Sequence, residues 1–144
     1  MQKNADATIL DNNGRAAVHM AILNGNIKLT KLLLSSNKDL LELRDRLGQT
    51  PLYLATEQDY ANLCNLLITF GANIFADKLT DNNSGCCSFY LGLRLKQKFW
   101  SDLLFSSAEI GQCLSKFIKK ANDRNDDIFL DALTHMKNNF DENL

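Results

Sequence analysis

Apolar residues recur along this chain in three blocks that share one register. The blocks begin at Asp11, Asp45 and Asn82, so the offsets between them are 34 and 37 residues. In each block a polar turn with a glycine precedes a short apolar segment, which a polar loop joins to a longer one. The equivalent positions are Gly14, Gly48 and Gly85 in the turn, Ala21, Ala55 and Gly92 in the short segment, and Leu32–Leu34, Leu66–Ile68 and Leu103–Phe105 in the long segment. The spacing predicts two helices in every block, and neither could bury its apolar stripe unless the blocks stack.

The second block has the clearest helix start. Thr50 can cap the short helix through its hydroxyl group, and Pro51 occupies the first helical position, where a missing N–H costs nothing. The other two blocks replace this pair with Ala16–Ala17 and Cys87–Ser88, so we expect weaker helix starts there. Asp59 stands where the second block should have a glycine between its helices. The small residue shared by the short segments lets neighbouring helices approach closely.

Helical patterning continues beyond residue 107. Ser106 and Glu109 have the spacing of a capping box, and two apolar stripes follow on either side of the polar turn "NDRNDD". The stripes consist of Ile110, Cys113, Leu114, Phe117, Ile118 and Ala121, and of Ile128, Phe129, Ala132, Leu133, Met136 and Phe140. We interpret residues 108–144 as a degenerate last repeat or capping hairpin with a polar outer face of Lys116, Lys119, Lys120 and Lys137. A helical hairpin that belongs to a separate domain is the alternative.

The repeated segments resemble the ankyrin repeat family. The resemblance rests on "DRLGQTPLYLA" and "LLITFGAN" in the second block, "DNNG", "VHMA", "NGN" and "LLL" in the first, and "NSG", "FYLG" and "LLF" in the third. It implies an all-α solenoid of stacked helix-turn-helix units that ends in a capping helix pair. The implied organisation is three repeats within residues 1–107, at about 11–44, 45–81 and 82–107, with a repeat tail at 5–10 and the hairpin at 108–144.

Composition and charge exclude several classes of function. Sixteen Lys and Arg residues against 17 Asp and Glu give a net charge of −1, so neither nucleic acid nor an anionic membrane is expected as a partner. No apolar run reaches the roughly 18 residues of a membrane span, and the first residues lack the core of a signal peptide. We expect a cytoplasmic monomer, or a protein of the host cytoplasm if it is a bacterial effector.

The candidate chemistry points away from catalysis. Four cysteines lack the paired spacing of a zinc site, and no phosphate-binding glycine loop or Ser/His/Asp arrangement occurs. His19 stands at the family's histidine position and should hydrogen-bond neighbouring turns, while His135 should face solvent. Cys64 is expected in the core, and a helix N-terminus beside Cys86–Cys87 leaves the reactivity of that pair open. We therefore predict a non-catalytic protein without metal or cofactor.

The resemblance also implies where a partner protein binds. In ankyrin-like stacks the turns and the exposed side of the short helices line one concave surface. By position this surface consists of Asn12, Asn13, Arg15, Leu23 and Asn24 from the first repeat, Arg46, Leu47, Gln49, Glu57 and Gln58 from the second, and Asn83, Ser84, Cys86, Arg94 and Leu95 from the third. Its three arginines favour an acidic or mixed-polarity protein surface, with Leu47 as an apolar anchor. The alternative is that these arginines are merely solvated.

The sequence also predicts the burial of one aromatic residue and the exposure of another. Trp100 aligns with Leu29 and Leu63 in the long segments, so we expect it in the core, with an exposed binding hot spot as the alternative. Phe75 follows "GANI" and is expected to be exposed.

The predicted function is a non-catalytic protein–protein interaction module. The alternative is a targeting or substrate-recruitment segment of a larger bacterial effector or enzyme. A start inside a repeat tail and an Asn, Lys and Ile content typical of an AT-rich genome keep this alternative open. The length of the native reading frame would separate the two.

Overall fold

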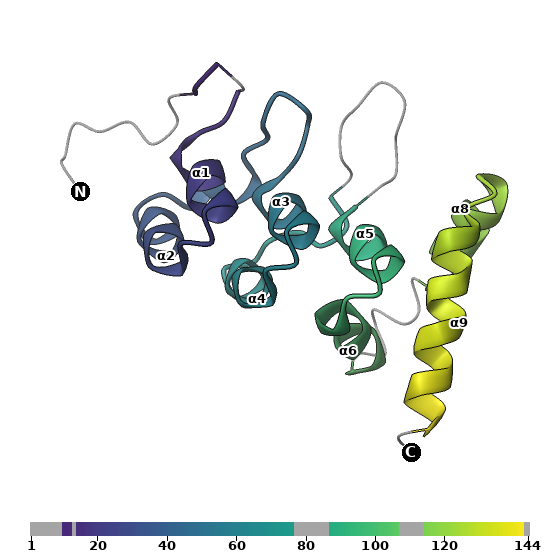
Figure 1. Cartoon of the computed structure of the whole chain (residues 1–144). Helices are drawn as coiled ribbons and strands as arrows, with labels where there is room; N and C mark the ends of the chain where they lie inside the picture. Colours follow the sequence, from purple (N-terminus) through teal and green to yellow (C-terminus); the bar gives the residue numbers. More distant parts are fainter. Residues whose placement is uncertain (1–9, 13, 77–86, 107–113, 143–144) are drawn as a thin grey trace. The chain divides into compact units, whose positions relative to one another are not determined.

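The computed structural model describes residues 10–12, 14–76, 87–106 and 114–142. Every regular element among them is a helix, which confirms the predicted all-α class (Figure 1). Several predicted positions lie outside the described residues, namely Asn13, Asn83, Ser84, Cys86, Glu109, Ile110 and Cys113.

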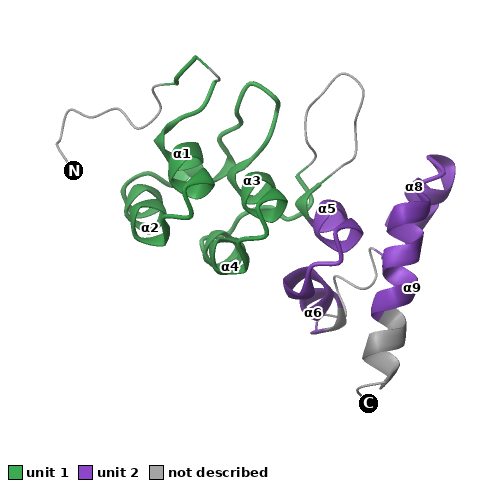
Figure 2. Ribbon diagram, viewed as in Figure 1, with its two compact units in different colours: residues 1–88 green, residues 89–144 purple. Residues whose placement is uncertain are grey.

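The chain forms two compact units, residues 1–88 and 89–144 (Figure 2). The helices of the first unit are α1 (Ala17–Leu23), α2 (Ile27–Ser36), the 3-10 helix η1 (Lys38–Glu42), α3 (Pro51–Glu57) and α4 (Ala61–Thr69). The other helices that the structure describes are α5 (Ser88–Arg94), which starts at the boundary, α6 (Lys98–Ser106), α8 (Leu114–Asp123) and α9 (Asp127–Glu142). Because the boundary falls inside the predicted third repeat, the repeat limits at 82–107 and 108–144 stay predictions.

The same tight turn joins the two helices of each described pair. In the first pair the N–H of Asn26 donates to the C=O of Ala21 at 2.8 Å, and in the last the N–H of Asp126 donates to the C=O of Ala121 at 2.8 Å. Each turn has one residue with left-handed backbone. These residues are Gly25 (φ 67°), Asp59 (59°), Lys96 (59°) and Asn125 (54°). The shared turn supports the proposal that α8 and α9 are a degenerate repeat.

The helix starts in the first unit follow the sequence rules closely. Thr50 accepts a hydrogen bond from the N–H of Tyr53 at 3.2 Å, and Pro51 is the first residue of α3, as predicted. At the start of α1 the side chain of Ala16 caps nothing, and its N–H donates instead to Nδ1 of His19 at 2.9 Å. The ring of His19 thus accepts a backbone N–H at this helix start, where the alanine has no side-chain group that could cap the helix.

The 3-10 helix η1 was not predicted. Asn37 starts it by accepting the N–H of Asp39 at 3.0 Å, and Glu42 at its end accepts the N–H of Asn73 at 2.7 Å. This second bond ties the end of the first repeat to the turn that follows α4. Phe75 in that turn is 38% exposed, in agreement with the prediction.

The core of the second unit is aromatic. Trp100 is fully buried, so the predicted core position is confirmed. Phe89 meets its ring edge-on at 6.1 Å between centroids, and Tyr90 stacks on Phe129 at 4.2 Å. Gly92 leaves the room that the indole ring occupies, because a Cβ there would lie 2.1 Å from the ring.

Two apolar residues of the predicted helices are more exposed than their neighbours in the pattern. Ile128 is 57% exposed, because the buried positions of α9 are Phe129, Ala132 and Met136, which turns Ile128 toward solvent. Leu29 is 39% exposed although the aligned Leu63 is 1% exposed. The predicted apolar stripe is therefore wrong at Ile128, whereas Leu29 keeps its place in the register but is less covered than Leu63.

Candidate functional site

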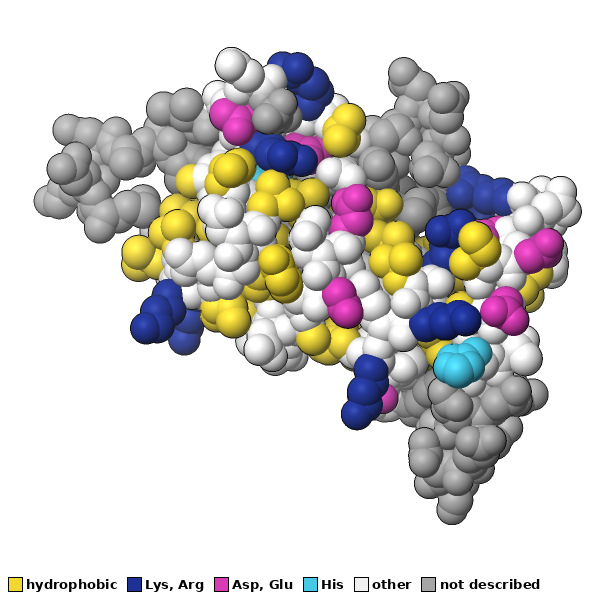
Figure 3. All heavy atoms as spheres, in the orientation of Figure 1, with side chains coloured by type: hydrophobic (Ala, Val, Ile, Leu, Met, Phe, Trp, Pro, Cys, Tyr) yellow, Lys and Arg dark blue, Asp and Glu magenta, His cyan; other side chains and the backbone are white. Residues whose placement is uncertain are grey.

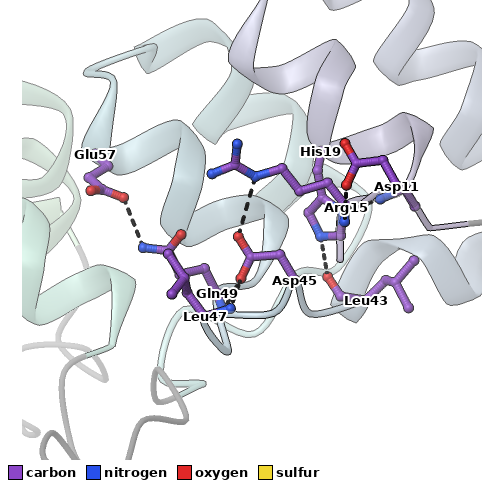
Figure 4. Close-up of polar contacts among 9 residues, drawn as sticks. Asp11, Arg15, His19, Leu43, Asp45, Leu47, Gln49 and Glu57 are labelled. Carbon is purple, nitrogen blue, oxygen red and sulfur yellow. Dashed lines mark hydrogen bonds and ion pairs between the residues drawn. The ribbon is translucent and has the colours of Figure 1, made fainter. Parts of the chain in front are cut away.

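Asp45 organises the turn that precedes α3. Its Oδ1 accepts the backbone N–H groups of Leu47 at 3.0 Å and Gln49 at 2.9 Å (Figure 4). The N–H of Gly48 also donates to the C=O of Asp45 at 3.0 Å. Because these bonds fix the backbone on both sides of the tip, Leu47 is presented on a well-defined loop. Asp45 is not among the predicted site residues, and it is buried although it is charged.

Arg15 connects the first turn to this second one. Its Nε lies 3.7 Å from Oδ2 of Asp45, and neither of these buried atoms has a hydrogen bond. The N–H of Arg15 donates to Oδ1 of Asp11 at 2.9 Å, which orders the first turn. In Figure 4 the two terminal nitrogens of Arg15 point away from Asp45. The guanidinium group is thus attracted to Asp45 on one side and open on the other.

A depression of about 210 Å³ lies where the two turns meet. It is lined by Arg15, Asp45, Arg46 and Leu47. Arg46 is exposed and Leu47 is 53% exposed, so both are accessible to a partner. Two guanidinium groups against one carboxylate leave a positive charge here, beside an apolar side chain. This combination suits an acidic side chain with an apolar neighbour.

Gln49 does not belong to the accessible surface. It is 3% exposed, and its Nε2 donates to Oε2 of Glu57 at 3.1 Å. This burial argues against the predicted direct contact of Gln49 with a partner, which stays a prediction. The bond orients Glu57, which is exposed at the end of α3, so Gln49 supports the surface from beneath.

The other described residues of the predicted surface differ in accessibility. Asn12, Asn24 and Gln58 are exposed and Leu23 is half-buried, all in the first unit. Leu95 is 45% exposed in the second unit. The predicted grouping of Arg94 with the two arginines of the first unit stays a prediction, because Arg94 belongs to the second unit.

Arg94 is engaged within its own unit. Its Nε donates to Oδ2 of Asp126 at 3.2 Å, and the hydroxyl of Tyr90 donates to the same oxygen at 2.6 Å. The N–H of Phe129 donates to Oδ1 at 3.1 Å. Burial alone would raise the pKa of Asp126, but these hydrogen bonds and the charge of Arg94 hold it below its ordinary value of 3.8. Arg94 therefore links α5 to the start of α9.

His19 has the structural role that the sequence predicted. With Nδ1 accepting the N–H of Ala16, Nε2 carries the proton and donates to the C=O of Leu43 at 2.7 Å. The ring is buried and joins α1 to the chain that enters the second turn. Burial lowers the pKa of His19 below its ordinary value of 6.5, because the charged ring would lose its hydration there.

This lowered pKa predicts a loss of stability in mild acid. The unfolded chain takes up a proton as the pH falls below 6.5 and the folded chain resists it, so the free energy of unfolding should fall in that window. Protonation of Asp126 lowers the free energy of unfolding further only when the pH falls below its ordinary pKa of 3.8. Urea unfolding from about pH 7.5 to pH 5.5 checks this. His19→Gln should flatten the pH dependence and His135→Gln should keep it; a flat profile in the unmodified chain would contradict the prediction.

The described cysteines are poor nucleophiles. Cys64 is 1% exposed, and burial raises the pKa of its thiol to about 11, in keeping with the predicted core position. Cys87 is fully buried at the start of α5. In the part of the chain that the structure describes, no three His, Cys, Asp or Glu side chains are grouped as a metal site would need. No described helix combines the length and the apolar character needed to cross a membrane.

Comparison with known proteins agrees with the stacked helix pairs. A family profile described as ankyrin repeats in three copies matches residues 1–78. Delta-latroinsectotoxin-Lt1a of Latrodectus tredecimguttatus is 36% identical over 77 residues, which cover 53% of this chain and 6% of the toxin. Human protein phosphatase 1 regulatory subunit 27 is 39% identical over 61 residues, which cover 42% of this chain and 39% of that protein.

A probable serine/threonine-protein kinase of Dictyostelium discoideum is 37% identical over 73 residues, which cover 48% of this chain and 7% of the kinase. The chain thus spans 39% or less of the length of each of these three relatives. The family profile covers more than half of the chain, which therefore belongs to the ankyrin-repeat family.

Proposed function

We propose that this protein is a non-catalytic interaction module that binds a partner protein through the turns of its first two repeats. The observation that carries the proposal is the depression where Arg15, Arg46 and Leu47 meet beside Asp45. Ankyrin repeats are a protein-interaction module. One relative is named a regulatory subunit of a phosphatase, which supports a binding role.

The chemistry of the depression indicates the kind of partner surface. A guanidinium group presents a planar fork of donors that matches a carboxylate, and Arg15 and Arg46 lie on two adjacent turns. Leu47 offers an exposed apolar side chain on a loop that Asp45 fixes, so little conformational entropy is lost on binding. The proposed partner surface combines an acidic residue with an apolar one. The proposal rests on two arginines, since Arg94 is held by Asp126.

Truncating the accessible side chains of this depression should weaken binding. A partner recovered from cytosol by affinity pull-down and mass spectrometry would be titrated in a calorimeter against Arg46→Ala and Leu47→Ala. Each variant should lose more than about 1 kcal/mol, roughly fivefold in Kd. Lys119→Ala, at an exposed position of α8 in the second unit, is the matched control and should bind like the unmodified protein. Unchanged affinity in both turn variants, with the fold intact, would end this assignment.

A recruiting role within a longer polypeptide is the second candidate. It is favoured by the toxin and the kinase, of which the matched segment makes up 6% and 7%. In that case the same surface would bring a substrate or partner to chemistry located elsewhere. The length of the native reading frame decides between the two, because a frame no longer than this chain leaves no room for a catalytic domain.

A further inference from the structure

One side of the first helix pair is apolar and exposed. Met20 on α1 is 42% exposed, and on α2 Leu29 is 39% and Leu32 51% exposed. We call these three residues the N-terminal face. Figure 3 shows hydrophobic side chains gathered over α1 and α2. The feature is absent from the next repeat, where the residues equivalent to Met20 and Leu29 are 2% and 1% exposed, namely Leu54 and Leu63.

The contrast between the two repeats shows what kind of element packs at these positions. In the second repeat the equivalent residues are buried, and its helices α3 and α4 pack against α1 and α2. The first repeat presents large apolar side chains at these positions, and a patch of exposed apolar side chains marks an interaction site.

The charges beside the N-terminal face narrow the choice of partner. Neither α1 nor α2 contains Asp or Glu, and their charged residues are Lys28 and Lys31, both exposed on α2. A second copy of this chain would bring lysines against lysines. A helix with acidic residues beside its apolar stripe would instead meet opposite charge, which favours association and sets its orientation.

We propose that the N-terminal face binds an amphipathic helix of a separate protein, in which Asp or Glu residues border the apolar stripe. Met20, Leu29 and Leu32 form the apolar part of the interface, and Lys28 and Lys31 pair with the acidic border. The mode is a helix laid against an apolar helical surface with its anchors at helical spacing. This contact is separate from the turn surface around Arg46 and does not depend on it.

Two synthetic amphipathic helices of about 18 residues test the proposal directly. They share one leucine stripe, which Glu borders in one peptide and Lys in the other, and binding is followed by fluorescence anisotropy. The Glu-bordered peptide should bind about tenfold more tightly or better, and Leu29→Lys should weaken its binding about tenfold. The double variant Lys28→Glu/Lys31→Glu should reverse the preference between the peptides.

Two control variants keep the test specific. Ile128→Lys changes an exposed apolar residue of the second unit, and Arg46→Ala changes the turn surface. Both should bind the Glu-bordered peptide like the unmodified chain, so failure of this proposal is distinct from failure of the proposed function. Circular dichroism confirms that Leu29→Lys folds, with Leu32→Lys as the second variant if it does not.

Three outcomes would overturn the proposal. The first is equal affinity for the two peptides, and the second is an equal loss of binding in Ile128→Lys. The third is self-association of the unmodified chain, seen by sedimentation and abolished by Leu29→Lys, which would assign the face to a second copy.

Discussion

Gly92→Ala should strongly destabilise the second unit. The added Cβ would lie 2.1 Å from Cδ1 and 2.2 Å from Cγ of Trp100, and this ring is fully buried and cannot move aside freely. We expect a cost at the upper end of about 1–3 kcal/mol, even though alanine favours a helix more than glycine does. Urea unfolding followed by the fluorescence of Trp100, the single tryptophan, measures it.

The other repeats suggest the compensating change. The second repeat has Ala55 and Leu63 at the positions that Gly92 and Trp100 occupy in the third. Trp100→Leu alone should leave a cavity, but in the Gly92→Ala background it should recover stability, with a coupling of about 1 kcal/mol or more. Circular dichroism measures the stability of the single and double variants, because Trp100→Leu removes the single tryptophan. A double variant no more stable than Gly92→Ala alone would show that the clash is not the cause.

Leu67→Ala should destabilise the first unit by about 2–5 kcal/mol, because the side chain is fully buried in α4 and its removal leaves a cavity. Thermal or urea unfolding followed by circular dichroism measures the loss. Leu32→Ala, the same substitution at a position that is 51% exposed, is the matched control and should change stability little. A melting temperature within a degree or two of the unmodified protein would mean that the assigned register is wrong.

The same variant tests whether the array unfolds as one. Trp100 reports on the second unit only, while circular dichroism reports on all helices. In a short solenoid each repeat is stabilised by its neighbours, so we expect Leu67→Ala to shift the two transitions together. A Trp100 transition that stays in place would instead show that the two units unfold independently.

The sequence allowed much of the fold to be predicted because each repeat places the same kind of residue at the same position. Thr50, Pro51 and Trp100 obey local or register rules and behave as expected. The 3-10 helix η1 is too short to have a periodic signal, so no pattern announced it. Leu29 shows the limit of the register, which assigns equivalent positions but not whether a neighbour covers them.

The candidate surface was less predictable, because its decisive contacts depend on the folded turn. The carboxylate of Asp45 binds backbone N–H groups that converge only once the turn has formed. The sequence predicts that Gln49 is exposed in a turn, but its amide donates a hydrogen bond to Glu57, eight positions later. Arg94 and Asp126 are 32 residues apart, a separation at which no local rule pairs charges.

The backbone conformation of the turn between paired helices does not depend on which side chain the turn carries. Left-handed backbone at this point is costly for residues with a side chain, yet an acidic, a basic and an amide residue all adopt it, at Asp59, Lys96 and Asn125. Packing of the helix pairs therefore imposes the conformation whatever the side chain is. These corners can accept a fluorophore, a cross-linker or a reversed charge while the helices on either side keep their positions.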